Sequence, residues 1–469
     1  MLKKANRDLT EGSITRGLIL FALPFLFSSI LQAAYNISDT FIISRFIGKE
    51  GVAATHSGGQ IMTVCINVAT GLSMGGTVVV SRFFGAKDKD GIRKSISSFF
   101  LIIFAVAALL TLVLFLFSDV FLRGINTPPE VMTEAKEFLQ IYSVGVLFLF
   151  GYNGIFALFR GMGNSQMTLM FVALSTVANF VMDLVMVVWL GGGTREAALS
   201  TTISIILCFV ASLIYFIRKR GVFYLSRDSL RPDWALCKRI LLIGLPGAVQ
   251  SSVFSISLLF MTSFINIYGV SASAASAIGA KVDSLFLLPF QAVSAAGSAM
   301  ISQNIGANKE LRVRKTLHNV LGISFSMAVC TCILSQLAPE TLMRFFADDS
   351  EVIRIGALYL RIVAINHLLV SILNSFNSLA IGAGNTVFPL CLTVMNAFVF
   401  RIPIGMFFER ILGMGLSGVF MGFGLANIGG AVAGYLYYRF GNWRRDLRAE
   451  SVGDGVGDVL TPVTDTPSG

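Results

Sequence analysis

Apolar runs long enough to cross a lipid bilayer recur along almost the whole chain, and they limit the folds that it can adopt. A membrane-spanning helix needs about 20 mostly apolar residues. With 55% hydrophobic and only 13% charged residues, against about 25% charged in soluble domains, the sequence predicts an all-α polytopic membrane protein. Twelve spans are expected, near residues 17–44, 51–80, 95–117, 137–159, 165–190, 196–217, 240–268, 272–301, 316–338, 354–380, 387–408 and 414–438.

The connections between the spans alternate in charge. Every second connection is basic, beginning with the amino-terminal segment, whereas the connections at 119–136 and 339–351 are acidic or mixed. Since basic loops remain on the cytoplasmic side, we expect both termini in the cytoplasm and the protein in the cell (inner) membrane. The net charge of +10 is spread over these loops, which argues against nucleic-acid binding. A polar start that leads into a full span argues against a cleaved signal peptide.

The chain contains an internal repeat. A shift of 221 positions places Gly48 on Gly269 and Gly85-Ala86 on Gly306-Ala307. Because an even number of spans separates equivalent positions, the two halves have the same orientation in the membrane. We therefore expect two pseudo-symmetric lobes of six helices each. The expected divisions are a cytoplasmic segment 1–16, an N lobe 17–217, a cytoplasmic linker 218–239, a C lobe 240–438 and a disordered cytoplasmic tail 439–469.

The first span carries a carboxylate, Asp39. An ionised side chain at the centre of a membrane helix costs about 2.5–3.5 kcal/mol, so it must face protein or water. Tyr35 and Asn36 precede Asp39 by four and three residues and share its helix face, and Gln32 begins the same polar stretch. Pro24 lies earlier in the span and favours a kink. The pattern predicts a helix that binds a proton or a cation in a transporter.

A second intramembrane carboxylate, Asp183, lies in the fifth span, with Asn179 one turn before it. At 1.5 Å per residue, both acids and the hydroxyls of Thr201 and Thr202 fall in the outer half of the membrane. Neither acid recurs in the second half of the chain, whereas the scaffold glycines do, so the acids are the better functional candidates. Close carboxylates share protons or coordinate Na⁺ with amide and hydroxyl oxygens. The alternative is that they only tie helices together.

The C lobe has a different polar inventory. Asp283 is expected to neutralise Lys281, Arg401 or another base, and a basic pocket for an anionic group is the alternative. His367 is expected to hydrogen-bond a neighbouring helix. No CxxC motif and no cluster at metal spacing occurs, so no cofactor or structural metal is expected. We assign the following residues to a substrate cavity: Tyr35, Gln32, Lys281, Asp283, Asn374, Asn377 and Arg401.

These motifs resemble those of the multidrug and toxic compound extrusion (MATE) family over residues 14–440. The resemblance is carried by Tyr35-Asn-x-x-Asp39-Thr40, Asn179-x-x-x-Asp183, Ser81-Arg-Phe-Phe-Gly-Ala86, Ser302-Gln-Asn-Ile-Gly-Ala307 and Arg160-Gly-x-Gly-Asn164. It implies a V-shaped fold and antiport of H⁺ or Na⁺ against organic, often cationic, amphipathic compounds. By position, Asp39, Asn179, Asp183 and Thr201 match the cation site of the N-lobe-coupled, DinF-like branch, in which helix 1 bends near Pro24. The acid that the other branch has in its seventh span is absent from 240–268.

The sequence thus predicts a secondary active exporter of drugs or metabolites that works by alternating access. Its partners would be small organic substrates and membrane lipid, and we expect a monomer. The alternative is a lipid or lipid-linked saccharide flippase, which additional spans and a strongly cationic central cavity would favour. A channel would need a pore-lining ring. An enzyme would need a nucleophile with its base, a metal motif or a nucleotide loop, none of which the sequence offers.

Overall fold

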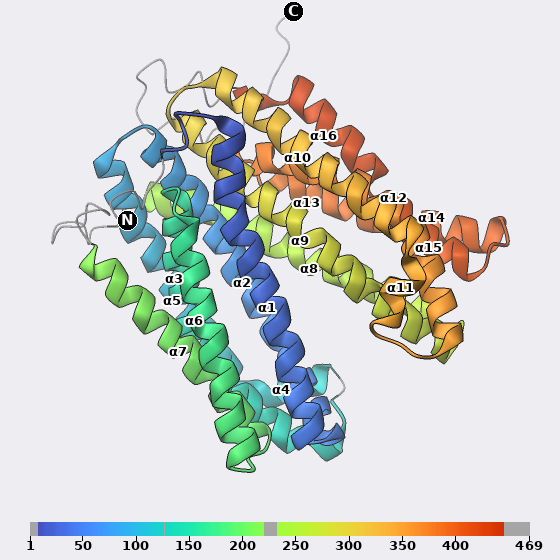
Figure 1. The fold of residues 1–469 in the computed structure, drawn as a ribbon. Helices are drawn as coiled ribbons and strands as arrows, with labels where there is room; N and C mark the ends of the chain where they lie inside the picture. Colours follow the sequence, from blue (N-terminus) through green and yellow to red (C-terminus); the bar gives the residue numbers. More distant parts are fainter. Residues whose placement is uncertain (1–7, 126, 220–231, 445–469) are drawn as a thin grey trace, which may run out of the picture.

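The computed structural model describes residues 8–125, 127–219 and 232–444 as helices with short connections (Figure 1). Twelve of the described segments are long and apolar enough to cross a membrane, and they confirm the expected spans. Most are longer than expected because the helices continue past the apolar core. They are Ile14–Phe46, Glu50–Gly85, Lys89–Leu116, Pro129–Gly161, Ser165–Trp189, Thr194–Arg218, Trp234–Asn266, Val270–Gly306, Glu310–Leu337, Ser350–Gly382, Val387–Ile411 and Leu416–Phe440.

The helices carry the labels of Figure 1. Those of the first half are α1 (Ile14–Phe46), α2 (Lys49–Gly85), α3 (Lys89–Leu116), α4 (Ser118–Gly124), α5 (Met132–Gly161), α6 (Ser165–Asp183) and α7 (Thr194–Arg218). Those of the second half are α8 (Trp234–Asn266), α9 (Val270–Gly306), α10 (Glu310–Leu337), α11 (Pro339–Arg344), α12 (Ser350–Gly382), α13 (Val387–Val394), α14 (Ile402–Met406), α15 (Leu416–Leu425) and α16 (Ile428–Phe440). Three π-helical segments extend these helices, at Leu184–Trp189, Met395–Arg401 and Phe407–Ile411.

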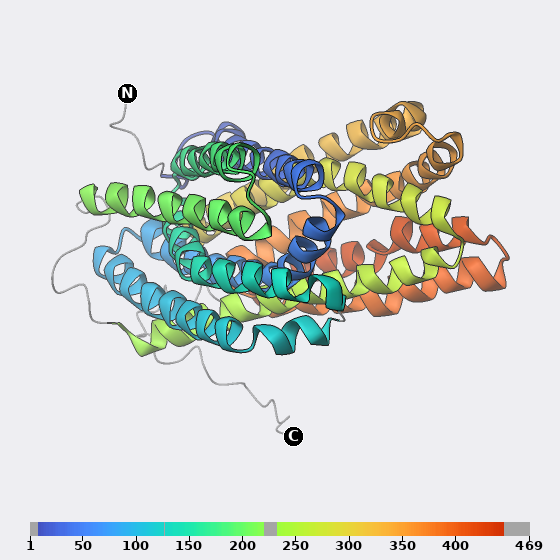
Figure 2. The same ribbon diagram turned by 90° about the horizontal axis from the view of Figure 1, so that it is seen from below.

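The helices form two lobes that meet at one end of the molecule and part towards the other, as the arms of a V do (Figure 1). The N lobe consists of α1–α7 and the C lobe of α8–α16, and the two lie side by side when seen from below (Figure 2). We call the end where the lobes meet the joined end and the opposite end the open end. Helix α1 begins at the joined end and runs to the open end (Figure 1).

The internal repeat is also present in the backbone. Within the described ranges, two residues other than glycine have positive φ, Lys87 (58°) and Asn308 (57°), and the 221-residue shift relates them. L-residues rarely adopt this conformation, so its recurrence shows that both halves make the same turn at the joined end. Glycines with positive φ recur in the same way, as Gly48 (92°) with Gly269 (95°) and Gly163 (77°) with Gly384 (85°).

Two glycines bring the backbones of the lobes together at the joined end. A Cβ atom on Gly85 would collide with the carbonyl oxygen of Gln303, and one on Gly306 would collide with that of Arg82. The same 221-residue shift relates both glycines and both of the residues they meet. Only glycine permits so close an approach. The lobes therefore touch here backbone to backbone.

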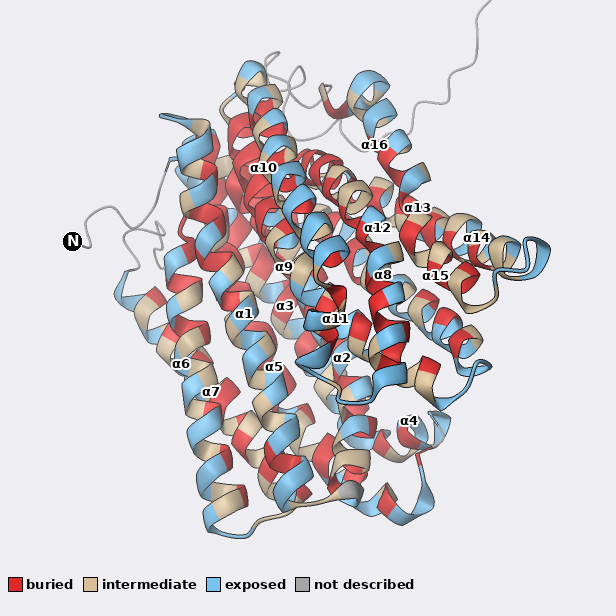
Figure 3. Ribbon diagram, turned by 45° about the vertical axis from the view of Figure 1, so that its right-hand side comes forward, coloured by how far each residue is buried: buried red, intermediate tan, exposed pale blue. Residues whose placement is uncertain are grey.

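Hydrogen bonds cross between the lobes around this contact. The side chain of Gln303 donates to the carbonyl of Gly161 (2.9 Å), and Arg82 donates to that of Ala383 (3.0 Å). A side chain of each lobe thus donates a hydrogen bond to the backbone at the end of a helix in the other lobe. Burial follows the same contact, since every residue from Ala296 to the end of α9 is buried and buried ribbon gathers where the lobes meet (Figure 3).

The residues before α1 form a strap, residues 8–13, that lies on the joined end of the C lobe. Leu9 is buried, and its N–H donates to the side-chain oxygen of Gln303 (3.0 Å). Arg312 donates to three strap carbonyls (3.1–3.3 Å), and Lys309 donates to the carbonyl of Thr10 (3.0 Å). The strap therefore ties the start of the N lobe to the C lobe.

Parts of the expected linker 218–239 and tail 439–469 lie outside the described residues. On either side of the linker gap, α7 ends at Arg218 and α8 begins at Trp234, earlier than the expected residue 240. Asp233 causes the early start, because its side chain accepts the N–H groups of Ala235 and Leu236 as an N-cap. Helix α16 ends at Phe440, and a short turn follows to Arg444.

Candidate functional site

A pair of acids lies inside the N lobe towards the open end. Asp39 on α1 and Asp183 at the end of α6 lie close enough for their carboxyl groups to interact, and their helices pack against each other. The side chain of Asp183 is buried and that of Asp39 is half-buried. Two ionised carboxylates at close range repel each other, so a proton or a cation held between them lowers the cost of placing them together. The structure thus brings together the two acids that the sequence singled out.

Hydroxyl and amide groups surround the pair. Ser200 on α7 donates to Asp183, and Asn179 donates to Thr201 (3.4 Å). The hydroxyl group of Tyr35 lies near Thr201 as well. Among the described residues, the buried side-chain oxygen of Asn179 has no partner. One acceptor of the cluster is therefore free for a further hydrogen or a cation.

Any cation held in this cluster would rely on oxygen atoms. In the part of the chain that the structure describes, no group of three or more His, Cys, Asp or Glu side chains is placed to hold a metal ion. The cluster offers two carboxyl groups together with amide and hydroxyl oxygens, which are ligands that hard cations accept. The same set of oxygen atoms can also hold a proton.

Asp183 marks the point where α6 changes its helical form. The α-helical bonding ends at Asp183, and the π-helical segment Leu184–Trp189 follows directly. Single π-turns are rare and are frequent at functional sites. The 221-residue shift carries this segment to the region of Phe407–Ile411, which is also π-helical, although the C lobe has no acid at the position equivalent to Asp183. Both lobes therefore have a π-helical segment at this position, whereas only the N lobe has a carboxylate before it.

Two residues expected near the acids form no side-chain hydrogen bond with them in the described residues. Asn36 is exposed, and its backbone carbonyl accepts a hydrogen bond from Thr40 (2.8 Å). Thr202 is buried against α5, where it donates to the carbonyl of Ile141 (3.4 Å). Both lie one residue away from a member of the cluster, and one residue turns a side chain by about 100° around a helix.

Two other residues of the site escaped the sequence reasoning. They are Ser200, which bonds to Asp183, and Tyr142 on α5, which lies close enough to Asp39 for the two to interact electrostatically. Residues 200–202 are three hydroxyl side chains in a row. Only the rotation of α7 decides which of them faces α6, so no signal in the sequence separates them.

In the C lobe, Asp283 pairs with a histidine. Its carboxylate lies 2.8 Å from Nε2 of His367 on α12, and His367 is buried. Of the bases expected to neutralise Asp283, the partner is His367 and not Lys281, because two residues on a helix point about 200° apart and Lys281 is exposed. Arg401 interacts electrostatically with Asp283. The expected hydrogen bond from His367 to a neighbouring helix is confirmed.

The remaining residues assigned to a substrate cavity do not gather in one place. Arg401 is buried, donates to Ser257 (3.1 Å), and lies 5.2 Å from the ring centre of Phe254. Asn377 is buried, and Asn374 takes part through its backbone carbonyl, which accepts from Ser294 (2.8 Å). Gln32 and Lys281 are exposed, and Tyr35 belongs to the acid cluster. Some of these residues are thus interior to a lobe and others are accessible.

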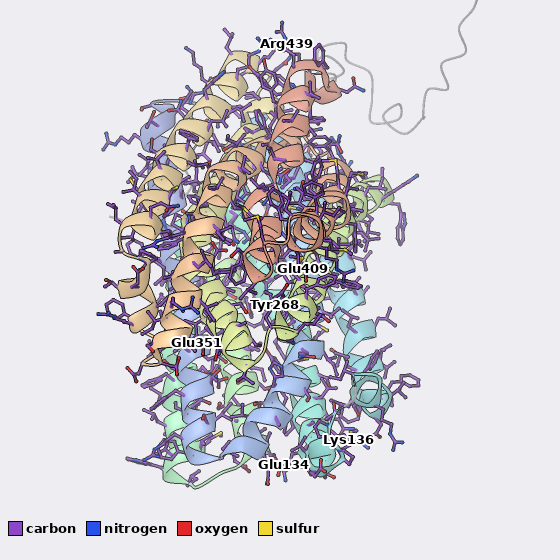
Figure 4. The ribbon with its side chains drawn as sticks, turned by 90° about the vertical axis from the view of Figure 1, so that its right-hand side faces the viewer. Glu134, Lys136, Tyr268, Glu351, Glu409 and Arg439 are labelled. Atoms are coloured by element: carbon purple, nitrogen blue, oxygen red, sulfur yellow. The ribbon has the colours of Figure 1, made fainter. Side chains whose placement is uncertain are left out.

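The two ends of the molecule differ in charge. At the open end, Glu134 accepts from Thr194 (2.9 Å) and Glu409 accepts from Tyr268 (2.9 Å). Figure 4 places Glu134 at the opposite end of the molecule from Arg439. The connections at the joined end, 86–94 and 307–315, are rich in lysine and arginine.

One family model and several related sequences match most of this chain. A family model described as MatE matches residues 24–185 and again residues 246–407. A probable multidrug resistance protein YpnP of Bacillus subtilis (strain 168) is 27% identical, over 93% of this chain and 97% of that protein. A probable multidrug resistance protein NorM of Thermotoga maritima is 28% identical, over 92% of this chain and 94% of that protein.

The fold also has solved counterparts. One is described as the outward-facing conformation of a multidrug resistance MATE family transporter of the MOP superfamily. It superimposes with a TM-score of 0.87 at 20% sequence identity, over 96% of this chain and 99% of that chain. At this identity the similarity is one of fold.

Proposed function

This chain belongs to the MatE family, and on that premise we propose that it is a secondary active exporter of amphipathic organic compounds, driven by H⁺ or Na⁺ entering in exchange. The close pair of carboxyl groups formed by Asp39 and Asp183 inside the N lobe carries the proposal. Relatives described as probable multidrug resistance proteins support drug-like or metabolite substrates. Small organic molecules and membrane lipid are then its partners, and it works as a monomer.

The acid cluster is the coupling site in this proposal. Asp39 and Asp183 hold the coupling ion, with Asn179, Ser200 and Thr201 as hydrogen-bonding neighbours. A proton would sit between the two carboxyl groups, whereas Na⁺ would take their place as a bridge with amide and hydroxyl oxygens. In both cases one positive charge offsets two acids that are otherwise costly to place together inside a membrane.

We further propose that the protein couples through the N lobe and so belongs to the DinF-like branch of the family. Two observations support this assignment. The N lobe contains the acid pair, and α8 has no Asp or Glu along its whole length. The acid of the C lobe, Asp283, is already engaged by His367.

The transport cycle alternates access by rocking the lobes about the joined end. The basic connections at that end support a cytoplasmic location for it and for both termini, so the open end faces outward. Pro24 lies inside α1, where it removes a backbone hydrogen bond, and Ser28 donates to its carbonyl (2.8 Å). Binding of the coupling ion at Asp39 would bend α1 near this residue and release the substrate outward.

The test is transport by purified protein in proteoliposomes. Efflux of fluorescent amphipathic dyes is followed with a pH gradient and a Na⁺ gradient imposed separately, for the wild type and Asp39→Asn. Movement driven by one gradient, and lost in the variant, supports the proposal and identifies the ion. Folded protein that moves no dye under either gradient contradicts it, and translocation of labelled lipid would then be measured because a flippase becomes the better candidate.

A further inference from the structure

Two helices display matching rows of exposed side chains. On α2 the row consists of Gln60, Thr63, Asn67 and Thr70, and on α9 it consists of Lys281, Ser284 and Gln291. We call them the α2 row and the α9 row. All of these side chains are exposed except Asn67, which is half-buried. The 221-residue shift places Gln60 on Lys281, Thr63 on Ser284 and Thr70 on Gln291, so the repeat exposes the same face of both helices.

These rows face the space between the lobes. Gly85 lies 25 residues after Gln60, and Gly306 lies 25 residues after Lys281. At 3.6 residues per turn, 25 residues end about 20° short of seven full turns, so each glycine shares the face of its row. Gly85 and Gly306 are the residues that contact the opposite lobe at the joined end. The same faces, followed towards the open end, therefore look across the V at each other.

Lys281 is the one fixed charge in the two rows. It lies eleven residues into α9, about 17 Å from the open end of that helix, where an ammonium group must face water or a counter-charge. Asp283, the acid nearest to it in sequence, is bonded to His367 inside the C lobe. Among the described residues, no carboxylate forms a salt bridge with Lys281, and neither row contains an acid.

We propose that Lys281 binds an anionic group of the transported compound, so that the substrates of this protein are amphipathic anions or zwitterions. This inference rests on the proposed function and names its substrate class. A carboxylate, sulfonate or phosphate on the substrate supplies a counter-charge for Lys281, which forms no salt bridge with the described residues. The hydroxyl and amide groups of the rows hydrogen-bond to the polar part of the compound.

The opposing α2 row adds to this preference. Gln60, the symmetry mate of Lys281, hydrogen-bonds to the ring nitrogen of His56 (2.9 Å), and both side chains are exposed. An amide with a neighbouring imidazole offers N–H donors to an anion without presenting a negative charge. A purely cationic compound would meet Lys281 with repulsion and would find no acid in either row.

The experiment compares two dyes that differ in a single charge. Rhodamine B has a free carboxylate and is a zwitterion, whereas its ethyl ester is a cation of nearly the same shape. Dissociation constants for both dyes are measured by fluorescence polarisation with purified protein in detergent, without any gradient. The wild type should bind rhodamine B more tightly than the ester, by about fivefold for one accessible ion pair.

Two variants of the same residue provide the matched comparison. Lys281→Gln gives the C lobe the residue that the N lobe has at the equivalent position, and it should weaken binding of rhodamine B by about fivefold while leaving the ester unchanged or bound more tightly. Lys281→Arg keeps the charge and should keep the preference. The proposal is overturned if the wild type prefers the ester, binds both dyes equally or binds neither. It is also overturned if Lys281→Gln leaves the ratio of the two constants unaltered.

A lipid headgroup is the competing occupant of Lys281. Binding of rhodamine B is therefore repeated with detergent micelles doped with phosphatidylglycerol or with the same fraction of phosphatidylcholine. Equal binding in both supports a soluble anionic substrate, whereas displacement by phosphatidylglycerol alone, lost in Lys281→Gln, assigns the position to lipid and overturns the proposal. No gradient is used, so these outcomes leave ion-driven export and the role of Asp39 to be judged by the proteoliposome assay.

Discussion

The carboxyl groups of Asp39 and Asp183 lie close together although they come from the first and the fifth membrane-spanning helices, and Ser200 from the sixth donates to the carboxyl group of Asp183. Three helices thus meet at one pair of acids in the N lobe. Anything that changes the occupancy of this pair by a proton or a cation changes how the three helices are held together. The first two predictions concern this relationship.

Replacing either acid by its amide should abolish gradient-driven efflux. Asp39→Asn and Asp183→Asn keep the size of the side chain and remove the ability to exchange a proton or to neutralise a cation. Efflux from proteoliposomes should fall to that of empty liposomes, while the purified variants remain monodisperse. Asn36→Ala is the control, since Asn36 is exposed and bonded only through its backbone. Wild-type efflux in Asp39→Asn, or lost efflux in Asn36→Ala, would contradict the assignment.

Ser200→Ala should slow transport and reduce stability. It removes a buried donor to Asp183, and loss of a hydrogen bond to a buried polar group costs about 1–3 kcal/mol. Ser204→Ala is a close control, because Ser204 is buried one turn away on α7 and bonds only to the backbone carbonyl of Ser200 (2.7 Å). Thermal unfolding and efflux rates are compared for both. Equal effects of the two substitutions would deny Ser200 a specific role.

His367→Leu should destabilise the C lobe more than a double substitution does. Leucine leaves Asp283 without its partner inside the lobe, and breaking a buried pair in this way costs about 3–5 kcal/mol. The double variant Asp283→Asn with His367→Gln removes the charge together with its partner and should lose less. Thermal unfolding of the two variants and of the wild type decides the order. A double variant that is less stable than His367→Leu would show that the pair is not the source of the loss.

Gly85→Ala should push the lobes apart at the joined end. The new methyl group would meet the backbone of Gln303, which cannot move out of the way as a flexible side chain can, so a loss of about 1–3 kcal/mol is expected. Gly322→Ala on α10 has nothing within 4 Å of its new Cβ atom. It should be neutral or stabilising by up to about 1 kcal/mol. Thermal unfolding separates the two, and similar behaviour of both would contradict the close contact.

Arg312→Ala should release the strap. Arg312 donates to three strap carbonyls, so without it the N–H groups of residues 8–13 should exchange hydrogen faster. Arg314→Ala lies on the same helix and removes a salt bridge to Glu310 one turn away (2.5 Å), so it should leave the strap protected. Hydrogen exchange read out by mass spectrometry compares the two variants. Unchanged exchange in Arg312→Ala would show that the strap is held by other contacts.

The sequence is sufficient to predict the fold because the bilayer imposes it. Membrane-length apolar runs locate the helices, and the 221-residue repeat assigns them to two lobes. Helix ends are less accessible to prediction. The start of α8 depends on the capping side chain of Asp233, and hydrophobicity does not report such a cap.

The candidate site was predictable in part. Asp39, Asn179 and Asp183 stand out because polar groups are rare in membrane spans, whereas Ser200 and Tyr142 do not. The sequence predicts that a base neutralises Asp283 but does not identify it, because the nearest base in sequence, Lys281, points to a different side of the helix and His367 is the partner. The packing of the helices determines which face of each helix points inward. The sequence limits the possible orientations but does not select one.

The lobes contact each other at Gly85 and Gly306, close to the ends of the long helices α2 and α9, so a small rotation about this contact moves the far ends of these helices by a large distance. Helix α2 has 37 residues, so it is about 55 Å long, and a rotation of about 10° about its joined end moves its other end by about 10 Å. Close to the contact, the same rotation displaces atoms by only a fraction of an ångström for each residue of distance from it. The side-chain packing around Gly85 and Gly306 therefore changes little. A rotation of this size about the joined end would therefore open a gap between the lobes that is wide enough for an organic molecule.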